Sequence, residues 1–261
     1  MTAACCIIGD EILNGKTRDS NAHFLARFLF GLGIDLKKIE VVEDDYTAIA
    51  DTVTHLSRKH DLVFTSGGIG PTHDDISYEA IARAYGLQTG IDKETCERMN
   101  TMMQARSADW KLTEARKRMA IFPQPSEIIR IDGLWVPVVV VNRNIHILPG
   151  IPRLFEQMVT AIQPRLESMA RERGLFGYHR TQIATKKGEG DIAHFLSELQ
   201  RRVKSENIKI GSYPRWGQSA EGIRVMVSVV GKGKAEVDAI GQEIAREIDG
   251  WAVDATDATK S

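Results

Sequence analysis

The sequence has few cysteines, and their arrangement excludes two classes of protein. Only three occur among the 261 residues, at Cys5, Cys6 and Cys96. An odd number without paired spacing argues against a disulfide framework and against a zinc site, and it indicates a reducing compartment. Cys5 and Cys6 lie inside an apolar run, so we expect them to be core thiols.

Long apolar runs are also missing. The longest, Val136 to Val141, is far too short to span a bilayer. The N-terminal apolar segment, residues 3–8, is too short for a signal peptide's apolar region and runs directly into Gly-Asp-Glu. We therefore expect a soluble, cytoplasmic protein without a membrane partner.

Neither sign of charge is in clear excess. The formal net charge is -1 and there is no long basic run, which argues against a nucleic-acid partner. Hydrophobic residues make up 43% of the chain and charged residues 26%, which are globular values. The length suits one large domain or two modest ones.

What the sequence does contain is a glycine-rich stretch, TSGGIGPTHDD, at residues 65–75. An apolar run that is typical of a buried parallel strand precedes it, and a helical pattern over residues 76–85 follows it. Glycines let the backbone approach a bound group closely, and amides before a helix form an anion site. Two adjacent aspartates would repel a bare phosphate, so the pattern favours a divalent cation between carboxylate and phosphate. The alternative is structural, since Gly-Gly turns are common and Asp is an ordinary N-cap.

Further strands and helices alternate around this stretch. We expect strands over residues 3–8 and 36–42 and helices from Ser20 and over residues 46–59, which gives a parallel sheet with right-handed crossovers. Acidic loops at residues 10–11, 44–45 and 74–75 would then meet at the carboxyl ends of the strands, where such sheets bind ligands. Three solvated loops with ordinary acidic residues are the alternative. Later in the chain we expect helical structure over residues 92–120, more strands over residues 128–131, 136–141 and 144–148, and a long helix from Phe155 to Glu172.

The pattern changes after a linker at residues 173–177. A strand, a helix, two strands and a helix then follow, which predicts a small two-layer α+β domain. We place the domains at residues 1–173 and 174–261 and expect the tail from Asp254 to be frayed. The predicted class is α/β, with a smaller α+β domain.

Three motifs together resemble one known superfamily. They are GDEILNG at residues 9–15 with Asn21 downstream, the glycine stretch at residues 65–75, and LPGIP at residues 148–152. They resemble the molybdopterin-binding-like superfamily, and within it the nucleotide pyrophosphatase branch. That branch includes the N-terminal domains of competence-damage-inducible proteins and of eukaryotic FAD synthetases, and residues 138–152 and 210–216 are most similar to eukaryotic members and the stand-alone fungal FAD/NAD pyrophosphatases. Residues 132–137 depart from the Gly-x-Ala-Pro-Gly segment of bacterial members.

The resemblance, which covers nearly the whole chain, implies a fold and an activity. It implies a three-layer, mostly parallel sheet domain of molybdopterin-binding type and a homodimer. It also implies hydrolysis of FAD to FMN and AMP, with NAD(H) and ADP-ribose as other substrates, a divalent cation (Mg, Co or Mn), and potassium as a helper ion. The synthetase domain of eukaryotic relatives and the deamidase domain of bacterial relatives have no counterpart here, so we expect neither of those activities.

The resemblance also assigns roles to residues by position. The predicted metal ligands are Asp75, Asp44 and Glu11, and Asp74 is either a further ligand or the base for the attacking water, so that the predicted catalytic set is Asp74, Asp75 and Asp44. The predicted substrate-binding residues are Gly67, Gly68, Gly70, Thr72, Asn14, Asn21, Asp10, Tyr213 and Arg215. His73 either contacts the pyrophosphate or is a surface residue. Tyr213, Arg215 and Trp216 either stack on a flavin or base or belong to a packing strand and turn.

Two other functions stay open. The first is molybdopterin adenylyl transfer on the same fold, which the second domain and the Pro-Thr-x-Asp-Asp pattern disfavour. The second is a non-catalytic flavin or nucleotide binder, which would bind FAD tightly and release no product with any metal.

Overall fold

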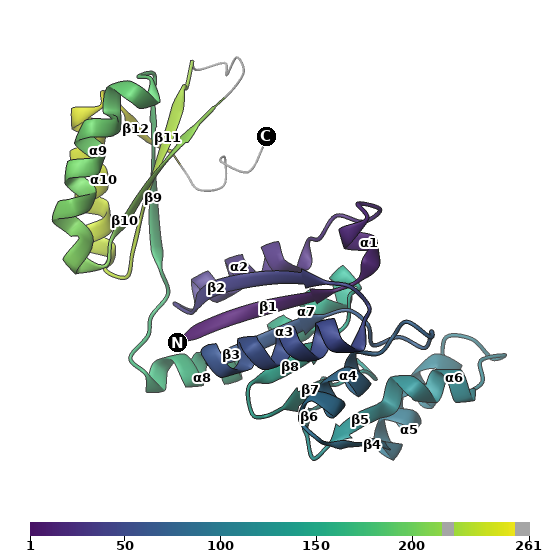
Figure 1. The fold of residues 1–261 in the computed structure, drawn as a ribbon. Coiled ribbons are helices and arrows are strands. Elements are labelled where there is room, and N and C mark those ends of the chain that lie inside the picture. Colours follow the sequence, from purple (N-terminus) through teal and green to yellow (C-terminus); the bar gives the residue numbers. More distant parts are fainter. Residues whose placement is uncertain (216–221, 254–261) are drawn as a thin grey trace. The chain divides into compact units, whose positions relative to one another are not determined.

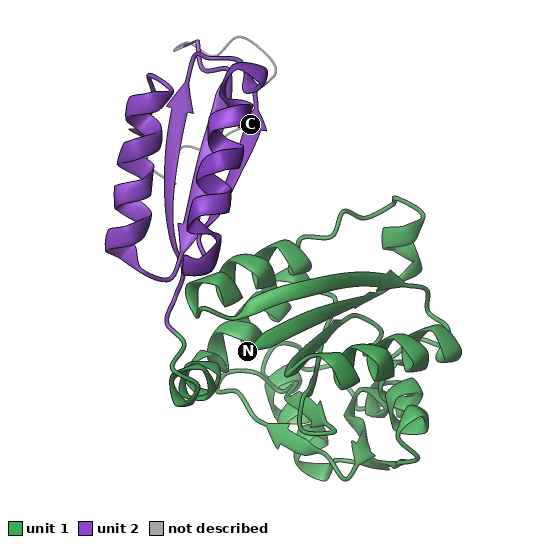
Figure 2. Ribbon diagram, turned by 60° about the vertical axis from the view of Figure 1, so that its left-hand side comes forward, with its two compact units in different colours: residues 1–175 green, residues 176–261 purple. Residues whose placement is uncertain are grey.

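The computed structural model of the protein describes residues 1–215 and 222–253. The chain divides into two compact units, Met1–Leu175 and Phe176–Ser261 (Figure 2). The division falls inside the linker that the sequence predicts at residues 173–177. In the described parts of the chain, no helix is long and apolar enough to cross a membrane.

The first unit is built on a six-stranded sheet. Its strands are β1 (Thr2–Ile8), β2 (Asp35–Val42), β3 (Leu62–Ser66), β6 (Glu127–Ile129), β7 (Val138–Val141) and β8 (Ile145–Leu148). They lie in the order β2-β1-β3-β8-β7-β6 (Figure 1). The pairs β1–β2, β1–β3 and β3–β8 are parallel, whereas β7 runs antiparallel to both β8 and β6.

Helices cover both faces of this sheet. They are α1 (Asp10–Leu13), α2 (Asn21–Gly31), α3 (Tyr46–Lys59), α4 (Ser77–Ala84), α7 (Pro152–Ala161) and α8 (Gln163–Glu172). The chain moves from β1 outward to β2 and then back across β1 to β3, so right-handed crossovers put α2 and α3 on opposite faces. Helix α2 packs with α7, and α3 packs with α4. The predicted three-layer, mostly parallel α/β domain is confirmed.

The central strands are buried along their whole length because helices cover both faces. Strand β3 and strand β7, which reads VVVV, are fully buried. Cys5 and Cys6 on β1 are buried core thiols, as predicted, and burial raises the pKa of Cys6 to about 12.

Residues 88–124 form a small lobe, here called the insert, with its own two-stranded sheet. It contains β4 (Gln88–Ile91), α5 (Lys93–Gln104), α6 (Glu114–Lys117), the 3-10 helix η1 (Arg118–Ala120) and β5 (Ile121–Gln124). The helical stretch predicted over residues 92–120 is therefore confirmed in α5, α6 and η1, and it is wrong for residues 105–113 between them. The chain turns back after Gln104 because Trp110 and Ala120 pack onto Cys96 and Met99 in a separate core, which one straight helix could not form.

Proline explains the other differences in the first unit. The long helix predicted from Phe155 to Glu172 begins at Pro152 and is divided at Ile162 into α7 and α8. Pro164 lies in the first turn of α8, where its missing N–H is tolerated but the preceding helix cannot continue. The strand predicted from Val136 starts only at Val138, after Pro137.

The second unit has two layers. Strands β9 (His179–Thr185), β10 (Lys209–Pro214), β11 (Val225–Gly231) and β12 (Trp251–Val253) form an antiparallel sheet in the order β10-β11-β9-β12. Helices α9 (Glu189–Val203) and α10 (Lys234–Glu247) pack on one face of it (Figure 1). A 3-10 turn, η2 (Lys204–Glu206), follows α9. The predicted small α+β domain is confirmed.

One buried titratable group makes the stability of the first unit depend on pH. His146 on β8 is 1% exposed, and its ring stacks on Phe64 with 5.1 Å between centroids. Its Nδ1–H donates to the Asn144 carbonyl at 3.1 Å, and burial lowers its pKa from 6.5 to about 4. The neutral ring therefore belongs to the folded state.

We expect acid to destabilise the protein through His146. Below pH 6.5 the imidazole of the unfolded chain becomes protonated, whereas in the folded state it stays neutral down to about pH 4. The free energy of unfolding therefore decreases as the pH falls from 6.5 to about 4. A shift of this size corresponds to about 3 kcal/mol. The variant His146→Phe should lack this part of the pH dependence. Chemical denaturation of the wild type and the variant at pH 7 and pH 4 measures the free energy of unfolding. An equal loss of stability in both proteins between the two pH values would contradict the prediction.

Candidate functional site

The site lies where the chain reverses its direction across the sheet. From β1 the chain goes to β2 on one side, and the next strand, β3, lies on the other side of β1. In open α/β sheets, the crevice at the carboxyl ends of such strands binds ligands. The loop after β1 carries Asp10 and Glu11, the loop after β3 carries the glycine stretch, and the loop after β2 carries Asp44.

Close backbone contacts bring three loops together at this edge. Gly67 has φ +116°, and a Cβ on it would lie 2.1 Å from the carbonyl oxygen of Ile8. A Cβ on Gly150, in the loop after β8, would lie 3.3 Å from the Cα of Gly67. Only glycine fits at position 67, and a side chain at position 150 would require the backbone at Gly67 to shift slightly.

The glycine stretch turns its carbonyls toward α4 and leaves amides free. Ser77 donates from N to the Gly68 carbonyl at 2.9 Å and from Oγ to the Gly67 carbonyl at 2.8 Å. Among the described residues, the amides of Gly68, Ile69 and Gly70 donate no hydrogen bond. Successive free amides of this kind form an anion-binding site.

Two of the predicted phosphate donors, Gly67 and Thr72, already donate hydrogen bonds within the protein, and their contact with substrate stays a prediction. The Gly67 amide donates to the Leu148 carbonyl at 3.2 Å, because β3 and β8 continue their pairing to this point. Thr72 donates to Asp75 Oδ2 from N at 2.8 Å and from Oγ1 at 2.5 Å. The Asp75 carboxylate therefore closes its own loop, and it packs where a Cβ of Gly70 would be.

Acidic groups from three loops meet around Asp44. The Asp10 amide donates to Asp44 Oδ2 at 3.0 Å, and the Asp44 amide donates to Asp10 Oδ1 at 3.4 Å. Partial burial raises the pKa of Asp44, the bond from the Asp10 amide opposes this, and the charges of Asp10, Glu11 and Asp74 raise it further. The Glu11 carboxylate lies against Gly9, whose added Cβ would be 2.7 Å from Glu11 Oε2. The loops thus create a strongly negative edge, here called the acidic edge.

The oxygen donors of the acidic edge are of the kind that magnesium binds, but they do not form a complete set of metal ligands. In residues 1–215 and 222–253, no group of three His, Cys, Asp or Glu side chains is arranged to hold a metal ion. The predicted set of Asp75, Asp44 and Glu11 is therefore not preassembled, since Asp75 is bound to Thr72 and like charges repel. Magnesium usually takes only one or two carboxylates, with water and substrate phosphates completing its shell. Asp44 and Asp10 provide such a pair, and metal binding there stays a prediction.

The two predicted asparagines have different surroundings. Asn14 is exposed, and its Oδ1 accepts from the Lys16 amide at 3.0 Å. Asn21 is 4% exposed, and its Nδ2 donates to Ser66 Oγ at 2.8 Å and to the Gly150 carbonyl at 2.9 Å. Asn21 therefore joins α2 to the end of β3 and to the loop after β8. Its Oδ1 is buried and accepts no hydrogen bond from the described residues, and its contact with substrate stays a prediction.

The predicted aromatic cluster lies in the second unit. Tyr213 is 59% exposed at the end of β10, and the Arg215 amide donates to the Arg224 carbonyl at 2.8 Å. Trp216 lies outside the described residues. A substrate contact by Tyr213 and Arg215 stays a prediction.

The sequence did not single out a polar group beside the acidic edge. Tyr46 donates from its hydroxyl to Glu79 Oε2 at 2.6 Å, and Arg83 bonds the other oxygen of Glu79 at 2.5 Å while its guanidinium lies 4.1 Å from the Tyr46 ring centroid. Arg118 of the insert donates to the Asp75 carbonyl at 3.4 Å. In the sequence, the group could have been found only from the positions of Tyr46 and Glu79, each of which follows an acidic loop.

Comparisons with known proteins agree with this architecture. Residues 4–168 match the family described as "Probable molybdopterin binding domain", and residues 177–257 match "FAD synthase, middle domain". The chain is 34% identical over 231 residues to a protein named "Probable FAD synthase" from Caenorhabditis briggsae, covering 82% of this chain and 43% of that protein. It is 32% identical to a protein of Archaeoglobus fulgidus, covering 88% of this chain and 90% of that one.

A solved structure is similar to the larger part of the chain. The crystal structure of the protein CinA from Thermoplasma acidophilum has a TM-score of 0.56 and 30% identity, and the match covers 63% of this chain and 97% of that one. The chain spans less than half the length of the Caenorhabditis protein. It belongs to the family of probable molybdopterin-binding domains, in the branch that unites CinA with FAD synthases and that here also carries an FAD synthase middle domain.

Proposed function

We propose that the protein hydrolyses the phosphoanhydride bond of dinucleotide pyrophosphates, with a divalent cation. The substrate class is FAD, which would give FMN and AMP, together with NAD(H) and ADP-ribose. Magnesium, cobalt or manganese would serve as the cation and potassium as a helper ion.

The observation that carries the proposal is the pairing of free amides with the acidic edge. The amides of Gly68, Ile69 and Gly70 provide donors for phosphate oxygens. The carboxylates of Asp10, Glu11, Asp44 and Asp74 would repel the same phosphates. A diphosphate can occupy this site favourably only together with a cation.

Each residue then has a role that its surroundings support. Asp44 and Asp10 would hold the cation, with Glu11 and Asp75 as further oxygen donors. When bound, the cation would neutralise phosphate charge and favour an ionised water. Asp74, whose side chain is 57% exposed, is accessible to accept the proton of the attacking water. Asn21 would keep the end of β3 and the loop after β8 together through its hydrogen bonds to Ser66 and Gly150.

A substrate and metal panel tests the proposal. We expect AMP to be released from at least one of FAD, NADH and ADP-ribose when magnesium, cobalt or manganese is added, and not in the presence of a chelator. Chromatographic detection of AMP measures it. An absence of AMP with every pair of substrate and metal would refute the hydrolase.

The names of the relatives favour a second candidate, an adenylyl transfer. A FAD synthase transfers the adenylyl group of ATP to the phosphate of FMN and releases pyrophosphate, so it forms the phosphoanhydride bond that the proposed hydrolase would break. The family description favours instead a molybdopterin acceptor for the adenylyl group. Incubation with ATP and either FMN or molybdopterin tests this candidate. Formation of FAD or adenylylated pterin would replace the hydrolase.

We also propose that the protein forms a homodimer. Light scattering coupled to gel filtration measures its mass in solution.

A further inference from the structure

The insert contacts the glycine stretch through one cationic side chain. Arg118, the first residue of η1, donates from Nη2 to the carbonyl oxygen of Asp75 at 3.4 Å. This distance is at the weak end for a hydrogen bond. Arg118 is exposed, and this contact brings its guanidinium to the carboxyl end of the glycine stretch, whose amides at residues 68–70 are free.

The backbone around Arg118 is fixed on one side by packing against α4. Phe122 lies four residues further along on β5 and is 1% exposed. Its ring meets Tyr78 of α4 edge to face, with 5.0 Å between centroids. Since α4 follows the glycine stretch directly, this contact holds Arg118 in place relative to Asp74 and Asp75.

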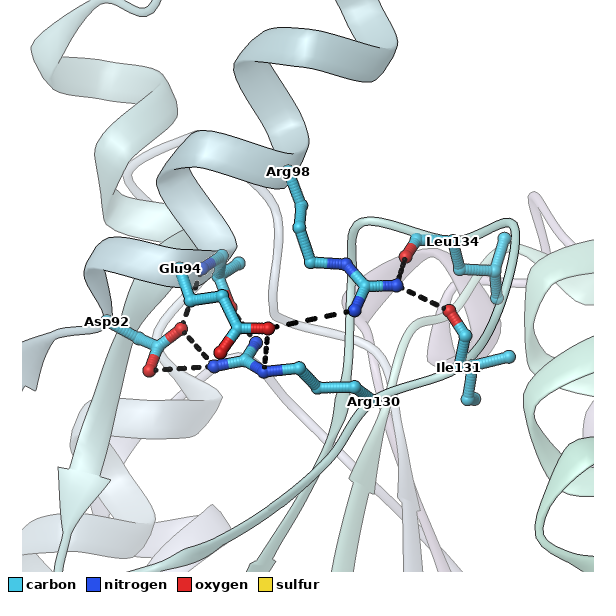
Figure 3. Close-up of polar contacts among 7 residues, drawn as sticks. Asp92, Glu94, Arg98, Arg130, Ile131 and Leu134 are labelled. Atoms are coloured by element: carbon cyan, nitrogen blue, oxygen red, sulfur yellow. Dashed lines mark hydrogen bonds and ion pairs between the residues drawn. The ribbon is translucent and has the colours of Figure 1, made fainter.

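A second contact holds the insert to the end of the large sheet (Figure 3). Arg130, just after β6, bonds Asp92 at 2.9 Å and Glu94 at 2.7 Å near the start of α5. Arg98 of α5 donates to the carbonyls of Ile131 at 2.9 Å and Leu134 at 3.0 Å. The insert thus contacts the rest of the first unit at two places, near Phe122 and at Arg130. These contacts fix the position of the segment that carries Arg118.

Arg118 differs from the neighbouring arginines in its partners. Arg83, Arg98 and Arg130 each have a carboxylate oxygen within 4.0 Å. For Arg118, no carboxylate oxygen of the described residues lies within that distance, although its charge interacts with Asp74 and Glu79 over a longer range. Of the five N–H donors of the guanidinium, one is used, and weakly.

We infer that Arg118 is a substrate-binding residue, whose guanidinium takes a phosphate oxygen of the bound nucleotide diphosphate. The inference rests on the proposed function, because it places the diphosphate on the amides of the glycine stretch. A guanidinium is always charged and matches two phosphate oxygens at once. Arg118 adds positive charge where the negative edge would otherwise repel the substrate, and it does so from a segment that the sequence motifs do not include.

Equilibrium binding of ADP-ribose by calorimetry, at low salt with magnesium, tests the inference directly. We expect Arg118→Ala to weaken binding at least about 10-fold, and Arg118→Lys to recover part of the loss because it keeps the charge but not the paired donors. The control is Arg106→Ala, an exposed arginine elsewhere on the insert, which should bind as the wild type does. Thermal unfolding of Arg118→Ala should match the wild type, since its one bond is weak.

The outcomes separate this inference from the proposed function. Equal affinity of the wild type and Arg118→Ala would overturn the inference, and so would a wild type that binds no ADP-ribose. If the wild type binds ADP-ribose but releases no AMP, while Arg118→Ala still weakens binding, the hydrolase proposal fails and the role of Arg118 stands.

Discussion

Replacement of Asp44 by asparagine is expected to lower kcat/KM for dinucleotide hydrolysis by about 100-fold or more. Asp44 is the carboxylate on which the loops after β1, β2 and β3 converge, through Asp10 and the charges of Glu11 and Asp74. An amide keeps the size and can still accept the Asp10 N–H, but it cannot neutralise a cation. The loss of about 3 kcal/mol of charge stabilisation corresponds to the expected fall in rate.

The same variant should be slightly more stable than the wild type without metal. The pKa of Asp44 is raised from 3.8 by burial and by its acidic neighbours, so the ionised form is less favourable in the folded state than in the unfolded chain. This cost is present above the raised pKa and disappears as the pH falls through it toward 3.8. At pH 7 we expect a rise in Tm of about 1–2 °C, from about 0.5 kcal/mol of screened repulsion.

Thermal unfolding with and without magnesium measures both the stability of Asp44→Asn and its ability to bind the cation. A cation that binds the folded state should raise the Tm of the wild type and leave that of Asp44→Asn nearly unchanged. The matched control is Asp51→Asn, an exposed aspartate on α3 away from the acidic edge, which should change neither activity nor the magnesium response. Undiminished turnover of Asp44→Asn at saturating metal would rule out the assigned role.

Replacement of Gly67 by alanine is expected to have the largest effect on stability. The residue has φ +116°, and the new methyl group would lie 2.1 Å from the backbone oxygen of Ile8, so no side-chain rotation can relieve the clash. Backbone strain and overpacking together cost about 3 kcal/mol or more. A loss of this size lowers Tm by about 6–12 °C.

Gly15→Ala is the control for this prediction. Gly15 also has a positive φ, +76°, but nothing lies within 4 Å of the position of its Cβ. The control variant therefore carries the conformational cost of about 1 kcal/mol without the clash. Thermal unfolding compares them, and similar Tm values for the two variants would show that the contact with Ile8 is not the cause. Hydrolysis by Gly67→Ala should also fall, because the free amides beyond Gly67 would move with it.

The sequence predicted the sheet well where its pattern is local. Strands β1, β3 and β7 are short apolar runs, and such runs are typical of strands buried on both faces. The placement of Asp10, Asp44 and Asp74 near one another followed from the topology alone, since the carboxyl ends of parallel strands share one edge.

The sequence predictions failed where residues distant in the chain determine the local structure. Strand β4 is mostly exposed and has no apolar alternation, and only its pairing with β5 more than 25 residues later makes it a strand. That the Gly67 amide is engaged and the Gly68 amide is free depends on the positive φ of both residues and on the pairing of β3 with β8. Asn21 is buried because Ser66 and Gly150 surround it, and no spacing in the sequence shows this. Arg118 lies in the short 3-10 helix η1, after a break that the helical pattern of residues 92–120 does not show.

The strand order has a consequence for the distances between the acidic groups. Asp44, Asp10 and Asp74 each follow one of three adjacent strands, β2, β1 and β3. Hydrogen-bonded neighbours in a sheet are about 4.8 Å apart, whatever the sequence. The sheet therefore fixes the intervals between the strand ends at which the three loops begin. Where each carboxylate lies beyond its strand depends on the loop itself, most of all for Asp74, which residues 67–73 separate from β3.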